Sequence, residues 1–145
     1  MKILTALKLA ASGLNTQRVR LNISAMNLAN ANVTRTLEGG PYRAKNIIVA
    51  ATPLPEKFLS KLDQALAGKL SEAKVVAIVD DQSPFREVYD PSHPDADENG
   101  IVRYPNVDVM TEMVDLLEAS RAYEANLSVV TITKNLALKT LDLLR

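Results

Sequence analysis

The stretch ILTALKLAASGLNTQRVRLNISAMNLA, residues 3–29, decides the fold, because its leucines recur every seven residues. The repeat consists of these leucines and of the residue four positions after each of the first three: Leu7, Ala11, Leu14, Arg18, Leu21, Ala25 and Leu28. Such 4-3 spacing is typical of a helix that packs along another helix, and we call this line the leucine seam. It predicts a helix from about Ile3 to Ala29, with Arg18 as the one charged interruption.

Asparagine is concentrated at the end of this helix, at positions 22, 27, 30 and 32. Since asparagine favours helix caps and turns, the segment around Asn30 predicts the end of the helix, and Gly39-Gly40-Pro41 predicts a turn. The amides have two interpretations. They are either surface polarity with a C-cap, or groups that bridge neighbouring subunits at a fixed register.

The last segment predicts a second long helix, from about Val107 to Leu144. Pro105 precedes it, and acidic residues in its early turns complement the helix dipole. Its stripe is defined by 3-4 spacing and comprises Met113, Leu116, Ser120, Tyr123, Leu127, Val130, Lys134, Ala137, Leu141 and Leu144, widened by Leu117, Thr131 and Leu138.

The middle of the chain predicts short strands, because it is rich in β-branched residues between turn signals. The expected strands are Asn46–Ala51, Lys74–Val79, Phe85–Tyr89 and Ile101–Tyr104. Glu56–Ala67 is a candidate short helix, and the loop DPSHPDADENG at 90–100 ends in Asn99-Gly100, a tight-turn signal.

These segments together predict a mainly α fold with a small β insert. The two terminal helices pair as a coiled-coil-like hairpin, and the middle is short and rich in β-hairpins. We expect residues 1–36 and 105–145 to form a helical core and residues 37–104 to form the insert. Both apolar stripes are broad, so part of them is expected to stay available to other subunits.

The net charge of the chain is zero, but the charges are unevenly distributed along the sequence. Seventeen Lys and Arg face seventeen Asp and Glu, which argues against an electrostatic DNA-binding protein. Residues 1–47 carry net +6, whereas residues 80–118 carry net −9. Either both segments are simply solvated, or they meet, within a subunit or between subunits, and in the second case the basic arm of one subunit faces the acidic helix start of a neighbour.

The sequence lacks features that several classes of protein require. No apolar run approaches the ~18 residues of a membrane span, and the amino terminus does not resemble a cleavable secretory signal. The chain has no cysteine, which excludes disulfides and thiolate metal sites. With a single histidine and no glycine-rich phosphate loop, the sequence indicates no enzyme, no catalytic residue and no cofactor.

The acidic loop partly matches a calcium-binding loop. Asp95, Asp97, Asn99 and Gly100 fit positions one, three, five and six of that motif. Position twelve, however, is Asn106 instead of a glutamate, so a Pro- and Asp-rich turn is the favoured interpretation. His93 has no second His or Cys with which to share a metal, so we expect no metal site.

Four strings resemble the rod and hook family of the bacterial flagellum: SGLNTQRVRLNISAMNLANANVTRT at 12–36, GGPYRAK at 39–45, DPSHPDAD at 90–97 and PNVDVMTEMVDLLEASRAYEAN at 105–126. The Pro-Tyr-Arg-Ala-Lys string at 41–45, the DPSHPDAD loop and the short length narrow the resemblance to the proximal rod, whereas the terminal strings are shared across rod and hook subunits. It covers nearly the whole chain except about 52–73.

The resemblance implies a non-enzymatic subunit that polymerises helically into the drive shaft between the membrane ring and the distal rod and hook. Such subunits leave the cytoplasm through the flagellar type III export apparatus without a cleavable signal and reach the periplasmic rod. The implied partners are copies of itself, FlgB, FlgF, FlgG, FliE and the FliF membrane ring, with no nucleic acid and no membrane span. The alternatives are another proximal-rod paralogue, a non-flagellar helical-hairpin adaptor or a calcium-binding module.

The candidate subunit-interface residues combine the apolar lines of the two helices with positions matched to the family motifs. We expect Glu112 and Arg121 to make polar contacts and Tyr123 to pack on a neighbouring helix. The full set is Leu7, Leu14, Leu21, Asn27, Leu28, Asn30, Asn32, Thr34, Tyr42, Asn106, Asp108, Glu112, Arg121, Tyr123, Asn126 and Leu127.

Overall fold

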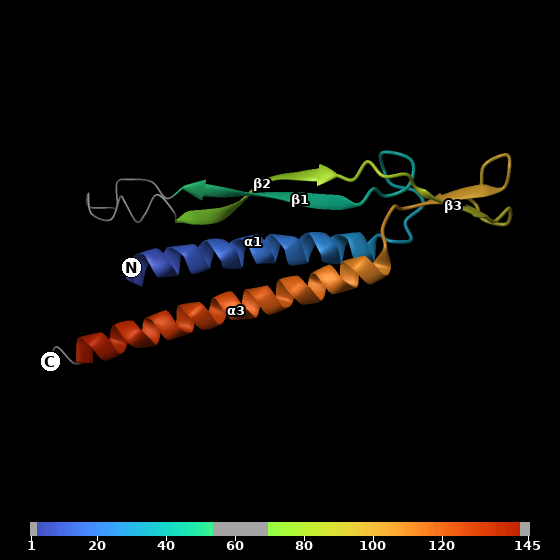
Figure 1. Cartoon of the computed structure of the whole chain (residues 1–145). Helices are drawn as coiled ribbons and strands as arrows, with labels where there is room; N and C mark the ends of the chain where they lie inside the picture. Colours follow the sequence, from blue (N-terminus) through green and yellow to red (C-terminus); the bar gives the residue numbers. More distant parts are fainter. Residues whose placement is uncertain (1–2, 54–69, 143–145) are drawn as a thin grey trace. The chain divides into compact units, whose positions relative to one another are not determined.

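The computed structural model describes residues 3–53 and 70–142. In chain order they form α1 (Ile3–Ala29), β1 (Lys45–Pro53), β2 (Ser71–Asp80), β3 (Arg86–Tyr89), β4 (Ile101–Tyr104) and α3 (Val109–Asp142) (Figure 1). The predicted mainly α fold with a small β insert is confirmed. The candidate helix at Glu56–Ala67 and the predicted end of the last helix at Leu144 lie outside the described residues.

The amino-terminal helix ends where the asparagines predict. The side-chain amide of Asn30 donates to the carbonyl of Met26 at 2.8 Å, and its backbone N–H donates to the same carbonyl at 3.1 Å. A turn follows, in which the N–H of Thr36 donates to the carbonyl of Gly40 at 2.8 Å. Gly39 and Gly40 have φ angles of 90° and 76°, a region that favours glycine, so this turn needs both of them.

Helix α3 starts two residues later than predicted, because Asp108 is its N-cap. One carboxylate oxygen of Asp108 accepts from the N–H of Met110 at 3.1 Å, and the other accepts from the hydroxyl of Thr111 at 2.8 Å. The carbonyl of Asp108 accepts the first intrahelical bond, from Glu112 at 3.0 Å. Further along, the hydroxyls of Ser128, Thr131, Thr133 and Thr140 donate to carbonyls one turn earlier.

The chain divides into two compact units, and each contains parts of both long helices. Unit 1 comprises Met1–Val19, Ile48–Ala77 and Ala119–Arg145, and unit 2 comprises Arg20–Ile47 and Ile78–Glu118. This division differs from the predicted helical core and β insert, which remain a proposal for the assembled state. In the described part of the chain, no helix is long and apolar enough to span a membrane.

In unit 1, the first part of α1 lies between the β1–β2 ribbon and the last part of α3 (Figure 1). The hydroxyl of Thr16 donates to the carbonyl of Ala73 in β2 at 3.3 Å, and Lys8 pairs with Glu72 at 3.8 Å. On the other side, α1 approaches α3 closely. A Cβ atom on Gly13 would lie only 2.9 Å from the amide oxygen of Asn126, so glycine allows this approach.

In unit 2, the end of α1 contacts the start of α3 through Asn27 and Glu112. Strands β3 and β4 form an antiparallel pair with Val88 opposite Val102 and Glu87 opposite Arg103. Val102 is fully buried, and Arg103 pairs with Glu87 at 3.3 Å. The loop that joins these strands closes at Gly100, whose φ of 75° fits the predicted Asn-Gly turn.

Candidate subunit interface

The side-chain amide of Asn27 is the centre of a buried polar network in unit 2. Only 1% of Asn27 is exposed. Its nitrogen donates to the carbonyl of Lys45 at 2.9 Å and to a carboxylate oxygen of Glu112 at 2.7 Å. Its oxygen accepts from the hydroxyl of Tyr42 and from the N–H of Lys45, both at 2.9 Å. All four hydrogen-bonding positions of the amide are therefore satisfied.

Asn106, directly before the start of α3, makes a second set of polar contacts in the same unit. Its amide oxygen accepts from the N–H of Ala44 at 2.9 Å. Its amide nitrogen donates to the hydroxyl of Ser83 at 2.8 Å and to the carbonyl of Asp81 at 3.2 Å. Because Ala44 and Lys45 are consecutive, Asn27 and Asn106 together fix the start of β1 relative to both helices.

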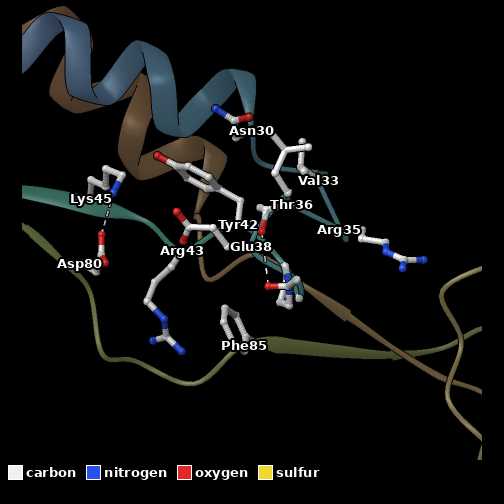
Figure 2. Close-up of a pocket in the computed structure, with 14 residues that line it drawn as sticks. Asn30, Val33, Arg35, Thr36, Glu38, Tyr42, Arg43, Lys45, Asp80 and Phe85 are labelled. Carbon is white, nitrogen blue, oxygen red and sulfur yellow. Dashed lines mark hydrogen bonds and ion pairs between the residues drawn. The ribbon is translucent and has the colours of Figure 1, made fainter.

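Figure 2 shows the surface hollow beside this network, with Tyr42 and the Lys45–Asp80 ion pair at its wall. The hollow has a volume of about 960 Å³. Burial raises the pKa of the Tyr42 hydroxyl, and the hydrogen bond with Asp80 at 2.9 Å raises the pKa of Lys45. Both groups therefore keep their protons at neutral pH. Tyr42 remains a hydrogen-bond donor to Asn27, and Lys45 remains paired with Asp80.

Asp95 and Asp97 of the acidic loop accept hydrogen bonds from within the loop or from the segment after α1. One carboxylate oxygen of Asp97 accepts from the N–H groups of Asn99 and Ile101, both at 2.9 Å. Asp95 accepts from the hydroxyl of Thr34 at 2.8 Å, which ties the loop to the segment after α1. Among the residues that the structure describes, no group of three or more His, Cys, Asp or Glu side chains could hold a metal ion.

The leucine seam is not the line on which α1 packs within the chain. The buried line of α1 consists of small and polar residues together with Ile23, namely Ala10, Thr16, Ile23, Ser24 and Asn27. The four leucines of the seam are half-buried, and Ala11, Arg18 and Ala25 are exposed. The seam therefore remains accessible beside the intrachain contact.

Helix α3 also exposes most of its large apolar residues, while Leu116, Tyr123 and Val130 are half-buried. Ala119 is fully buried on its inner line, where Asn126 meets Gly13. The large apolar side chains are exposed to 45–71%: Met110, Met113, Val114, Leu117, Leu127, Val129, Ile132, Leu136, Leu138 and Leu141. An apolar surface of this extent is typical of a contact with another chain.

Comparisons with known proteins find similarity to flagellar rod proteins. A family model described as Flagella basal body rod protein matches residues 7–35, and one described as Flagellar basal body rod FlgEFG protein C-terminal matches residues 98–143. The flagellar basal-body rod protein FlgC of Yersinia enterocolitica is 44% identical over 145 residues, which cover 99% of this chain and 98% of that protein. The FlgC proteins of Salmonella typhimurium and Bacillus subtilis are 41% and 40% identical, over 99% and 95% of this chain and 98% and 95% of those proteins.

The chain belongs to the FlgC family of flagellar basal-body rod proteins. The predicted resemblance to the flagellar rod is thereby confirmed.

The structure of this FlgC-family chain places the candidate residues in separate groups. Asn27, Tyr42 and Glu112 share one network, Asn106 lies next to it, and Asp108 caps α3. The others lie outside that network. Asn30 caps α1, Thr34 binds the acidic loop, and Asn126 lies against Gly13. Three more candidates, Asn32, Arg121 and Leu127, are exposed, and Tyr123 is half-buried. Their roles between subunits of the FlgC-family assembly stay predictions.

The sequence did not predict some residues that the structure adds to the candidate interface of this family member. The predicted stripe of α3 includes Met113 and Leu117 but leaves out Met110 and Val114, which lie beside them and are 71% and 61% exposed. Their spacing of i, i+3, i+4 and i+7 from Met110 was the available signal. Lys45 was also missed, since a strand residue gives no indication that its backbone will bind Asn27.

Proposed function

We propose that this chain polymerises helically in the proximal rod and forms part of the drive shaft that carries torque to the distal rod and hook. As a FlgC-family member it is a structural subunit of the flagellar basal-body rod. The observation that supports polymerisation is the exposure of most of the large apolar side chains of α3.

The proposal includes a non-enzymatic role and a route. The subunit passes through the flagellar type III export apparatus and assembles in the periplasm with copies of itself, FlgB, FlgF, FlgG, FliE and the FliF membrane ring. A shaft needs many contacts along its length, and two long helices with apolar residues on their outer sides provide them. Contacts between different surfaces of identical subunits give an open helix when the rotation between neighbours does not close a ring.

The test uses the leucine seam, which we propose as a subunit contact. Replacing Leu14 or Leu21 with aspartate should abolish incorporation into rods while leaving export intact, because a carboxylate on an apolar contact loses its hydration. Export is measured as secreted subunit, and incorporation as subunit in purified basal bodies. The exposed Asn22→Asp serves as the matched control on the same helix.

Both leucines are half-buried, so a folding defect has to be separated from an assembly defect. Met113→Asp, on the exposed face of α3, provides a second variant that does not touch the intrachain contact. Normal motility with either leucine variant would contradict the role of the seam. A parent chain that never appears in basal bodies would contradict the proposed function itself.

A further inference from the structure

The two compact units of the chain carry opposite charge. The ranges of unit 1 contain eleven Lys and Arg against five Asp and Glu, which gives net +6. The ranges of unit 2 contain six Lys and Arg against twelve Asp and Glu, which gives net −6. Unlike charges favour a contact between unit 1 of one copy and unit 2 of another, and such a contact between different surfaces repeats without closing.

Arg18 of unit 1 is the charged residue within the leucine seam, between Leu14 and Leu21. It is exposed, and its guanidinium donates to the side-chain oxygen of Asn15 at 3.0 Å. The ion pairs within 4.0 Å among residues 3–53 and 70–142 do not include it. If a neighbouring helix covers the seam, this charge is desolvated, which is costly unless a carboxylate meets it.

The start of α3 in unit 2 has the complementary arrangement. Its exposed apolar residues form a stripe on one face of the helix, which we call the methionine stripe: Met110, Met113, Val114 and Leu117. Glu118, also exposed, flanks this stripe one turn after Val114. Within the described part of the chain, Glu118 belongs to none of the ion pairs. An apolar stripe with an exposed carboxylate at its edge, free of ion pairs with residues 3–53 and 70–142, suits an apolar seam that contains an arginine.

We propose that the leucine seam of one copy packs on the methionine stripe of a second copy, with Arg18 facing Glu118 of the partner subunit. The inference rests on the proposed function and adds which surfaces of the two copies meet. A single charged pair within an apolar helix contact sets the register, because sliding either helix separates Arg18 from Glu118. The pair therefore determines the stagger between adjacent copies.

The absence of cysteine from the natural sequence makes a direct test possible. Cells would express one copy with Arg18→Cys and another with Glu118→Cys, and isolated basal bodies would be treated with a short bifunctional maleimide, because two cysteines in place of a long Arg–Glu pair lie too far apart for a direct disulfide. A cross-linked dimer of the two variants is expected. The matched control pairs Arg18→Cys with Lys139→Cys, which is exposed elsewhere on α3 and should give at least about tenfold less dimer.

A charge exchange provides the second measurement. R18E alone and E118R alone should each reduce incorporation at least about tenfold, because like charges then meet, and the double variant R18E/E118R should restore it. If both copies enter basal bodies without cross-linking, and the double variant is no better than either single variant, the pairing is overturned while the proposed function stands. If the parent chain itself is absent from basal bodies, the proposed function fails.

Discussion

The Asn27 amide shows how one buried side chain positions three segments of the chain. It binds Lys45 at the start of β1, Tyr42 before it and Glu112 in α3, and no position of the amide is left unpaired. The sequence indicated the asparagine but left two interpretations open. The structure does not support surface polarity with a C-cap for Asn27, because only 1% of it is exposed. Its four hydrogen-bond partners lie within the same unit, and a role between subunits stays a prediction.

Replacing Asn27 with alanine is expected to destabilise the chain by about 3 kcal/mol. Four half-buried groups of Tyr42, Lys45 and Glu112 lose their partner, and water satisfies them only in part, so the cost stays below the sum of the ~1–3 kcal/mol of each fully buried unsatisfied group. The measurement is the urea midpoint followed by far-UV circular dichroism at one protein concentration. Asn22→Ala is the control, since Asn22 is exposed on the same helix and alanine has the higher helix propensity. Equal midpoints for the two variants would rule out the network as a source of stability.

Gly13→Ala is expected to lower stability by about 1 kcal/mol in the parent chain, although alanine alone favours a helix by up to ~1 kcal/mol. The added methyl group collides with the Asn126 amide, which is also held by a bond to the carbonyl of Ala122 at 2.9 Å. In an Asn126→Ala background the collision is absent, and the same substitution should stabilise. A double-mutant cycle of thermal unfolding measures this reversal, and additivity would refute the contact.

At the scale of elements, the Asp108 cap gives α3 a pH dependence. The Thr111 hydroxyl, and then the N–H of Met110, hold the pKa of Asp108 below its usual value of 3.8. A carboxyl whose pKa is lower in the folded chain contributes stability above its unfolded pKa, and this contribution is lost as the pH falls through the folded pKa. The cap therefore acts at neutral pH and disappears in acid.

Asp108→Ala should accordingly lower the thermal midpoint by a few degrees at neutral pH, and this difference should shrink as the pH falls below about 4. Circular dichroism at a series of pH values provides the measurement. Asp108→Asn keeps a capping side chain and should lie between the parent and the alanine variant. A difference between parent and alanine variant that stays constant down to pH 2 would exclude the ionised cap as its cause.

The sequence predicted the bounds of the helices and strands better than it predicted which side of each helix packs within the chain. Helix α1 has the predicted bounds, and all four strands begin within three residues of the prediction, because periodicity and β-branched residues are local signals. The inner faces depend on how closely two helices approach, and the structure uses Gly13, Ala10 and Ala119 there instead of the leucines. A hydrophobic period locates large side chains, whereas close approach selects small ones, so the leucine seam could not be assigned to a partner from spacing alone.

For the whole molecule, the described core is small. Its buried hydrophobic residues are Ala10, Ile23, Ala31, Ala44, Val102 and Ala119, and four of these six are alanines. A chain that buries so few large side chains gains little from the hydrophobic effect alone. Stability then depends strongly on what neighbouring copies cover.

We therefore expect the dilute purified subunit to be only partly helical, with helicity that rises with concentration as copies associate. The urea and thermal midpoints of the variants above are accordingly compared with the parent chain at one protein concentration, high enough for association. Far-UV circular dichroism over a dilution series, alongside sedimentation to record association, provides the measurement. Full helicity with a cooperative thermal transition in a dilute monomer would contradict the coupling of folding to assembly.

The hydroxyl groups along the last part of α3 have a consequence for the cost of dehydration. The side chains of Ser128, Thr131 and Thr140 are exposed, yet each hydroxyl already donates to a carbonyl of its own helix at 2.8–3.0 Å. When a neighbouring copy displaces water from this surface, these hydroxyl donors keep their hydrogen bonds, because the acceptors are carbonyls of the same helix. A polar surface can thus become dry at little enthalpic cost, and the adjoining leucines and valines retain most of the free energy gained by their burial.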